Sequence, residues 1–231
     1  TSRVSTKTAI SWRRGYRIIP KFLMGKPTDV FAIKMNFLPI FLRNLLAGFI
    51  AHINNGSNKI YGLPEPDHKF GATHPTINSE LLYKIRHGKI QPKPEIVRFE
   101  GKTIYFKDSS CEEFDSVIAC TGFELAHPFF DKKFLNYTEG PVPLYLKMFH
   151  AEYDNLYFIG MFQPLGCIWP GAEQQSILAT LALKGLWKRP SNIKTLCERE
   201  VTNPHMKQIN TSRHRITVDF HKFLKDLKNL N

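Results

Sequence analysis

Cysteine is scarce in this sequence and widely spaced. The four cysteines, Cys111, Cys120, Cys167 and Cys197, are too far apart to form the C-x-x-C knuckle of a metal site. A chain of 231 residues is also long enough to bury a core without a disulfide framework. We therefore expect reduced thiols, no metal site and a cytoplasmic location.

Long hydrophobic runs are missing as well. The most apolar stretch, residues 37–53, is interrupted by Pro39, Arg43, Gly48 and His52, and it is too short and too polar to span a bilayer. A buried or groove-lining helix is the favoured interpretation, and a helix lying on a membrane surface is the alternative. Because the N-terminal residues also lack the order of a signal peptide, we expect no transmembrane segment.

The usual signatures of hydrolytic enzymes do not occur either. The sequence contains no Ser-His-Asp order, no HExxH and no carboxylate pair with an obvious spacing. Nothing in it therefore indicates nucleophilic or metal-dependent hydrolysis. Any chemistry has to be sought in how the chain would bind a ligand or a cofactor.

Charge, by contrast, is abundant and of one sign. The 32 Lys and Arg residues exceed the 20 Asp and Glu residues, which gives a formal net charge of +12. Such a surplus favours anionic partners, among them nucleic acid, acidic membranes and phosphate-bearing cofactors. The basic residues are spread along the chain with no run of five, which argues against a dedicated nucleic-acid stripe.

The stretch from Asp115 to Phe123 has the pattern of a buried strand that ends at a ligand. An acidic residue leads into an apolar run, and the run stops at Thr121 and Gly122. This pattern predicts a strand covered on both faces in an α/β sheet, where ligands bind past the C-terminal ends of the strands. Gly122 could adopt a positive φ or let the backbone approach a ligand closely. A tight turn without a ligand is the open alternative.

A second candidate site follows the alternating residues 8–12, which predict a strand. Arg13 and Arg14 come directly after it, and Gly15 follows. Two guanidinium groups at the end of a strand are suited to holding a phosphate, because arginine offers a planar fork of donors. From these residues alone a solvated basic turn is the favoured interpretation.

The rest of the chain alternates between short strands and helices, which indicates an α/β fold. Asn54 to Gly56 is expected to end the first helix, and Gly88 the second. The expected helices cover residues 36–53, 78–87, 172–184, 193–201 and 218–230. The remaining expected strands lie around Ile90 and over 95–99, 103–106, 144–149 and 156–161.

Taken together, these pieces resemble the flavin-containing monooxygenases. The resemblance rests on segments in a fixed order, namely Ile10–Gly15, His74–Thr76, Asp115–Phe123, Ile159–Gly166 with Pro170, Glu173, Gln175, Ala179, Thr180, Lys184 and Gly185 behind it, and Arg213–Phe220. In that family an Ala-Thr-Gly-Tyr-like motif marks the crossing between the NADPH and FAD domains. This sequence departs mildly from it, with Ala119-Cys-Thr-Gly-Phe123.

The resemblance implies a fold made of parts of two Rossmann-like domains, each doubly wound in three layers, and incomplete at the N-terminus. Residues 1–122 would be the remainder of the NADPH-binding domain, with a helical insertion at about 30–70. Residues 123–231 would be the C-terminal part of the FAD-binding domain. The family's two Gly-x-Gly-x-x-Gly turns, which cradle the pyrophosphates, do not occur among the 14 glycines of this sequence. The chain therefore looks like the C-terminal half or so of such an enzyme.

The same resemblance implies an enzyme that uses FAD, NADPH and O2 to oxygenate an amine nitrogen or a sulfide through a C4a-hydroperoxyflavin. Arg13 and Arg14 would contact the 2′-phosphate of NADPH. Thr121 and Gly122 would line the nicotinamide side of the domain crossing, and Gln163 would lie by the flavin, unless it only bonds backbone in its turn.

Several alternatives stay open at this point. The enzyme could instead be of the Baeyer–Villiger type, or the chain could be a non-catalytic fragment. It could also form a homo-oligomer or need a missing N-terminal half. The three phenylalanines at 129, 130 and 134 are expected in the core rather than in a substrate pocket.

Overall fold

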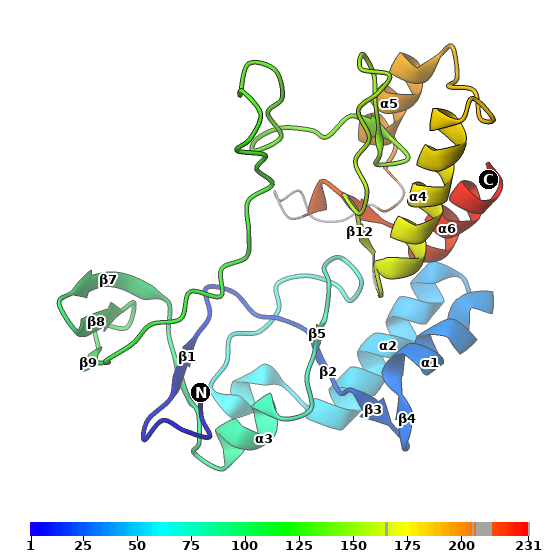
Figure 1. Cartoon of the computed structure of the whole chain (residues 1–231). Coiled ribbons are helices and arrows are strands. Elements are labelled where there is room, and N and C mark those ends of the chain that lie inside the picture. The colour runs from blue at the N-terminus through cyan, green and yellow to red at the C-terminus, as the bar shows by residue number, and fades with distance from the viewer. Residues whose placement is uncertain (165, 205, 207–213, 231) are drawn as a thin grey trace. The chain divides into compact units, whose positions relative to one another are not determined.

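The structure is a computed structural model that describes residues 1–164, 166–204, 206 and 214–230, without the side chains of residues 32, 36 and 40 (Figure 1). The chain divides into two compact units, Thr1–Cys120 and Thr121–Asn231. Each unit has helices and strands, so the expected α/β class is confirmed at this coarse level. Whether the units are parts of an NADPH domain and an FAD domain stays a prediction.

The first unit contains small sheets. Its strands are β1 (Ala9–Ser11), β2 (Ile18–Ile19), β3 (Phe22–Leu23), β4 (Lys26–Pro27), β5 (Thr76–Ile77), β6 (Gln91–Lys93), β7 (Ile96–Glu100), β8 (Thr103–Phe106) and β9 (Cys111–Glu113). The pairs β1–β6 and β2–β5 are parallel. Strands β3 and β4 form an antiparallel hairpin, and β7, β8 and β9 form an antiparallel sheet.

The helices of the first unit are α1 (Thr28–Lys34), α2 (Ile40–Asn55) and α3 (Leu81–Arg86), with short 3-10 helices η1 (Met35–Phe37) and η2 (Asn58–Tyr61). Pro39 stands directly before α2, and Gly56 ends it with a φ of 72°. Asn78 starts α3, since its Oδ1 accepts hydrogen bonds from the backbone N–H groups of Glu80 and Leu81, both at 2.8 Å. Both helices expected in this unit are confirmed. The first is a continuous α-helix only from Ile40 onward, because Met35–Phe37 form the 3-10 helix η1.

The hydrophobic core of the first unit is small. It joins Ile18, Leu63, Leu82 and Ile85, with Ile10 and Trp12 packed against it. The core therefore lies where the parallel strand pairs meet α3, and it holds the residues around Arg13 in place.

The described residues of the second unit form three α-helices and four short strands. They are β10 (Leu144–Tyr145), β11 (Phe149–His150), β12 (Gln163–Pro164), α4 (Trp169–Leu183), α5 (Ile193–Thr202), β13 (Thr217–Val218) and α6 (Phe220–Lys228). The expected helices at 172–184, 193–201 and 218–230 are confirmed. The strand expected over 144–149 is wrong, because Leu146 and Lys147 take positive φ values of 53° and 54° and turn the chain into a hairpin.

The larger core of the molecule lies in this second unit. Phe149, Phe162, Leu178 and Phe223 are each almost fully buried in one cluster to which α4, α5 and α6 contribute. A second cluster collects Val142, Leu144 and Phe158. Lys147 is also buried, and its Nζ lies 3.1 Å from Glu200 Oε2. This ion pair compensates the buried positive charge of the lysine.

The strand predicted from Asp115 to Phe123 does not form. No described strand pairs with this stretch, and the side chains of Val117 and Ile118 are 53% and 67% exposed. A strand buried on both faces needs neighbours that accept its backbone hydrogen bonds and cover its side chains. The described residues provide neither, so the apolar run stays extended and uncovered.

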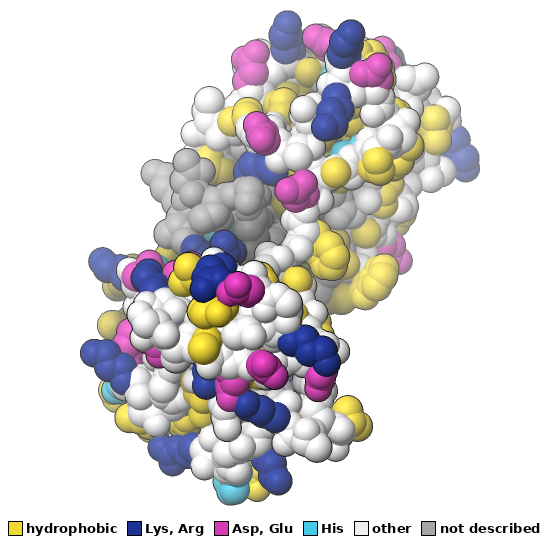
Figure 2. All heavy atoms as spheres, turned by 90° about the vertical axis from the view of Figure 1, so that its left-hand side faces the viewer, with side chains coloured by type: hydrophobic (Ala, Val, Ile, Leu, Met, Phe, Trp, Pro, Cys, Tyr) yellow, Lys and Arg dark blue, Asp and Glu magenta, His cyan; other side chains and the backbone are white. Residues whose placement is uncertain are grey.

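Basic side chains lie scattered among acidic ones on the faces seen in Figure 2, rather than in one continuous patch. Within the described residues, no helix combines the length and the apolarity that crossing a bilayer requires.

Candidate functional site

Arg13 and Arg14 lie just past the end of β1, where the sequence placed them. Arg13 is exposed, and the guanidinium of Arg14 lies 6.0 Å from the ring centroid of Tyr16. The parallel pairing of β1 with β6 sets the direction in which this turn leaves the sheet. One guanidinium is therefore free to meet solvent, and the other rests against an aromatic face.

Gly15 is needed at this turn because of a close approach of backbone. A Cβ atom placed on Gly15 would lie 2.2 Å from the carbonyl carbon of Glu65 and 2.4 Å from the nitrogen of Pro66. The turn that carries the two arginines is thus pressed against the loop at residues 65–68. Any larger residue at position 15 would push the two segments apart.

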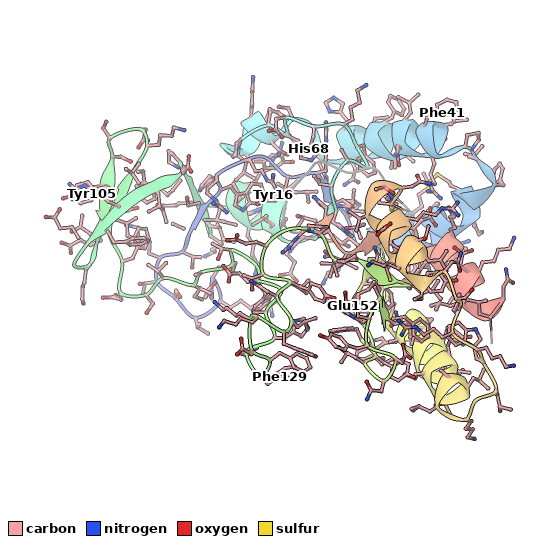
Figure 3. The ribbon with its side chains drawn as sticks, turned by 90° about the horizontal axis from the view of Figure 1, so that it is seen from above. Tyr16, Phe41, His68, Tyr105, Phe129 and Glu152 are labelled. Carbon is pink, nitrogen blue, oxygen red and sulfur yellow. The ribbon has the colours of Figure 1, made fainter. Side chains whose placement is uncertain are left out.

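That loop brings carboxylates and a histidine close to the arginines (Tyr16 and His68 are labelled in Figure 3). The backbone carbonyl of His68 accepts a hydrogen bond from Arg17 Nη2 at 3.1 Å. The hydrogen bond with His68 lowers the pKa of Asp67, and the positive charges of His68 and Arg14 add to this effect. The electrostatic surroundings of Arg14 therefore include an ionised carboxylate.

Asp67, His68 and Thr73 form a hydrogen-bonded row. His68 Nδ1 lies 2.8 Å from Asp67 Oδ1, and its Nε2 lies 2.8 Å from Thr73 Oγ1. The order resembles a nucleophile, a base and an orienting acid, yet the Thr73 side chain is buried and the histidine ring is only 6% exposed. The row holds the loop together and presents no accessible nucleophile.

Thr121 and Gly122 open the second unit and are exposed. Gly122 has a φ of 95°, as the sequence suggested, and a Cβ on it would meet nothing within 4 Å. The glycine is therefore required by the backbone conformation and not by crowding.

Gln163 belongs to β12, whose partner β13 lies parallel to it. Its backbone N–H donates to the carbonyl of Ile216 at 2.8 Å. The side chain is half-buried and forms no hydrogen bond within the part of the chain that the structure describes. Leu165, in the turn that follows, and Arg213 of the resembling tail segment lie outside the described residues.

Helix α4 starts at Trp169, close to where the turn after Gln163 was expected to begin a helix. Ile168 precedes it and provides no side-chain cap, and Pro170 stands in the first turn. No side chain caps the first backbone N–H groups of α4. The positive end of the helix dipole therefore faces the segment that precedes the helix. Glu173 is exposed on α4.

Gln175 is a positioning residue that the sequence reading left without a role. Its side chain is fully buried, with Oε1 accepting from the backbone N–H of Gly160 at 2.8 Å and Nε2 donating to the carbonyl of Leu146 at 2.9 Å. It thereby ties α4 to the chain that leads to Gln163. Its place on the same helix face as Gly171 and Leu178, both buried, is the signal that could have revealed it.

The second unit also contains a hollow of about 290 Å³ among aromatic side chains. It is lined by His127, Phe129, Phe130, Leu156, Tyr157, Phe158, Ile159, Gly160 and Met161. Phe129 points outward and is exposed, as Figure 3 shows, and Phe134 is exposed as well. The expectation that these phenylalanines belong to the core is therefore wrong for Phe129 and Phe134, and Phe129 instead lines the hollow.

Comparison with known proteins decides the family. A family model described as FMO-like, flavin-binding monooxygenase-like, matches residues 1–230. The chain belongs to this family. The resemblance inferred from the ordered motifs is confirmed.

Several curated relatives carry names of the same kind. Flavin-containing monooxygenase 5 of Rattus norvegicus is 33% identical over 75% of this chain and 33% of that protein. The protein of the same name from Cavia porcellus is 28% identical over 98% of this chain and 44% of its own length. Dimethylaniline monooxygenase (N-oxide-forming) 2 of Oryctolagus cuniculus is 30% identical over 82% of this chain and 37% of that protein. The chain thus spans less than half the length of these family members.

A solved structure, the crystal structure of Tmm from a Pelagibacter species, covers 62% of this chain and 33% of its own. The two structures superpose with a TM-score of 0.48 and share 18% sequence identity.

Proposed function

We propose that the chain forms part of an FAD- and NADPH-dependent monooxygenase that uses O2 to oxygenate a soft nucleophile, such as an amine nitrogen or a sulfide. The observation that carries this function is the family match over residues 1–230. When bound, the flavin supplies the oxygen transfer and NADPH the electrons. The name of one relative, a dimethylaniline monooxygenase that forms N-oxides, supports an amine as the substrate class.

On the NADPH side, the residues after β1 fit a phosphate. Arg13 offers an exposed guanidinium, and the loop pressed onto Gly15 holds the turn in one place. In this proposal Arg13 and Arg14 bind the 2′-phosphate through their guanidinium groups. The parallel pairs β1–β6 and β2–β5 support residues 1–122 as the remainder of a Rossmann-like NADPH domain, with α1 and α2 in its helical insertion.

On the flavin side, residues 123–231 are proposed as the C-terminal part of the FAD domain. The half-buried side chain of Gln163 would hydrogen-bond the flavin ring, and Thr121 and Gly122 would border the nicotinamide. The uncapped first turn of α4 would stabilise electron density on the flavin. Gln175 would keep the chain before Gln163 in register with α4. The cradles for both pyrophosphates are not among these residues, since no Gly-x-Gly-x-x-Gly occurs in the sequence.

The proposal also includes the location of the protein, its partners and the type of monooxygenase. The four free cysteines support a cytoplasmic location. The scatter of basic side chains supports a protein without a specific nucleic-acid partner. The names of the relatives support the flavin-containing monooxygenase type over the Baeyer–Villiger type.

The NADPH site is tested by titrating the purified chain with NADPH and with NADH while recording nicotinamide fluorescence. Replacing the pair as Arg13→Gln with Arg14→Gln should weaken NADPH binding roughly tenfold or more and leave NADH binding unchanged. The matched control is Lys102→Gln with Lys107→Gln, which removes two exposed charges elsewhere in the same unit. Equal losses for both nucleotides, or a loss in the control, would show that the pair is not a 2′-phosphate site.

The flavin site is tested separately by absorbance. The chain should bind added FAD, seen as a shift of the flavin bands, and Gln163→Ala should weaken that binding. Gln91→Ala, at an exposed position of strand β6, should not. A chain that never binds FAD would show that this chain is not an enzyme by itself.

A further inference from the structure

Aromatic rings gather around the hollow of about 290 Å³ in the second unit, which we call the aromatic hollow. The His127 ring contacts three phenylalanine rings, with centroids 5.5–6.5 Å apart, namely those of Phe129, Phe130 and Phe158. Its plane makes angles of 89° with Phe129 and 77° with Phe158, so ring edges meet ring faces, as aromatic pairs prefer. The hollow therefore offers both faces and edges of aromatic rings to a ligand that enters it.

Hydrogen bonds hold both segments of the aromatic hollow in place. The backbone N–H of Phe130 donates to the carbonyl of His127 at 3.0 Å, which closes a turn between two of the lining residues. In the other segment, the backbone N–H of Gly160 donates to the buried side chain of Gln175 on α4 at 2.8 Å. The hollow is therefore formed before any ligand binds, as sites for small molecules usually are.

The aromatic hollow has a buried floor and an exposed rim. Phe158 and Met161 are each 8% exposed, whereas Ile159 and Phe129 are 45% and 77% exposed. A ligand in the hollow would take apolar surface of the rim out of water, which favours binding. Since an apolar cavity of about 150 Å³ holds one benzene molecule, the hollow has room for one or two rings.

The lining of the aromatic hollow contains no charged side chain, because none of its nine residues is Lys, Arg, Asp or Glu. An anionic ligand would therefore meet no cation there. A cationic ligand would find ring faces but no carboxylate, and the net charge of +12 on the chain would oppose it. The charges thus favour a neutral ligand.

Two polar atoms at the aromatic hollow lack a hydrogen-bond partner. The Nδ1 of His127 and the hydroxyl of Tyr137 are both shielded from solvent, and neither has a partner within the part of the chain that the structure describes. The two rings lie 6.1 Å apart, centroid to centroid. Shielding a polar atom without a partner is unfavourable. Because a histidine ring turns readily about χ2, a rotation would offer Nδ1 to a donor in the hollow.

We propose that the aromatic hollow binds a small neutral aromatic molecule of one or two rings that carries one O–H or N–H donor. Its rings pack against Phe129 and Phe158, and its donor binds Nδ1 of His127 in the tautomer that has its proton on Nε2. The inference does not rest on the proposed monooxygenase function, because neither flavin nor NADPH takes part in this binding.

The test titrates 2-naphthol into the whole chain, without flavin, and follows binding by saturation-transfer difference NMR. This probe has two fused rings and one hydroxyl, and we expect a dissociation constant on the order of 1 mM or lower. Its methyl ether, 2-methoxynaphthalene, lacks the donor and should bind roughly fivefold more weakly. The anion 2-naphthoate and the cation benzyltrimethylammonium should also bind more weakly than 2-naphthol.

Three variants locate the binding. Phe129→Ser removes an exposed wall of the hollow and should weaken binding of 2-naphthol roughly fivefold. The matched control Phe123→Ser changes a fully exposed phenylalanine of the same unit that does not line the hollow, and it should bind as the parent does. His127→Phe keeps a ring without a nitrogen, so it should weaken binding of 2-naphthol and leave that of 2-methoxynaphthalene unchanged.

Far-UV circular dichroism of the two serine variants should match the parent, since both side chains are exposed. The comparison of the four probes on the parent decides the inference even if His127→Phe does not fold. No saturable signal from 2-naphthol up to about 5 mM would overturn it, as would equal binding by Phe129→Ser. Tighter binding of benzyltrimethylammonium would identify a cation site and overturn it as well. Self-association that disappears in Phe129→Ser, without binding of 2-naphthol, would identify a second copy of the chain as the occupant instead.

Discussion

Helices α2 and α4 differ by one residue in length and are both rich in apolar side chains, yet they bury opposite kinds of residue. Helix α4 packs Gly171, Gln175 and Leu178 inward, four and three residues apart. Helix α2 packs Gly48 and Ala51 inward and leaves its largest side chains outside. The difference teaches that apolar content predicts a helix but not the side that it buries. The neighbouring segments decide that side.

The largest expected difference between α2 and α4 is the effect on stability of shortening one leucine in each helix. Leu178→Ala should lower the free energy of unfolding by about 2–5 kcal/mol, because Leu178 is completely buried and its loss leaves a cavity. Leu45→Ala, at a position of α2 that is 67% exposed, should change it by less than about 0.5 kcal/mol. Urea denaturation followed by tryptophan fluorescence measures both, with Trp187 stacked on Phe149 as one reporter in the second unit. Similar losses for the two variants would break the comparison.

Alanine substitutions at two helical glycines should give the next largest difference in stability. A Cβ at Gly171 would lie 2.4 Å from Phe162 Cζ, so Gly171→Ala should cost about 1–3 kcal/mol. At Gly48 the nearest atom, Phe70 Cβ, is 3.4 Å away, and alanine favours a helix over glycine by about 1 kcal/mol. Gly48→Ala should therefore leave the melting temperature unchanged or raise it. A destabilised Gly48→Ala would mean that α2 is packed as tightly as α4.

The buried amide of α4 provides a polar version of the same test. Gln175→Leu leaves the N–H of Gly160 and the carbonyl of Leu146 without their partner, which should cost about 1–3 kcal/mol. Gln91→Leu, at an exposed position of strand β6, is the control and should be nearly neutral. Both are measured by the same denaturation curves. A neutral Gln175→Leu would show that the two backbone groups find other partners.

The smallest expected effect is on the pH dependence of stability, which should differ between the two units. Burial lowers the pKa of His150, with Arg189 adding to the effect, and its Nδ1 accepts from the backbone N–H of Glu152 at 3.1 Å. The unfolded chain therefore takes up this proton first, and stability should fall as the pH drops below the ordinary histidine value of about 6.5. The hydrogen bond from Ser57 lowers the pKa of Glu65 in the first unit, so its contribution is lost only below the ordinary carboxyl value of 4.5.

Melting temperatures measured from about pH 7.5 to about pH 5.5 check this prediction. His150→Asn keeps an acceptor but does not titrate, so it should flatten the decrease. A parent and a variant with the same pH dependence would contradict the role given to His150.

Local features of the fold were accessible from the sequence where one residue type dictates the backbone. Gly56 and Gly88 end helices with positive φ, and Asn78 starts α3, because these effects act within a few residues. The turn at Leu146 and Lys147 escaped prediction, since the buried ion pair with Glu200 that accompanies it comes from a distant helix. The candidate site divides in the same way. Arg13 and Arg14 could be placed at the end of a strand, whereas the bracing of Gly15 by residues 65–66 depends on chain 50 residues away.

The sequence by itself determined the family, through an ordered set of motifs that the family match over residues 1–230 confirms. It also determined most helices and the surplus of positive charge, because these depend on composition and on short-range spacing. Only the tertiary structure decided which apolar residues are covered. The run around Val117 was expected inside and is exposed, and α2 presents Phe41 and Phe49 outward. Burial depends on which segments lie opposite a residue, and no local pattern records that.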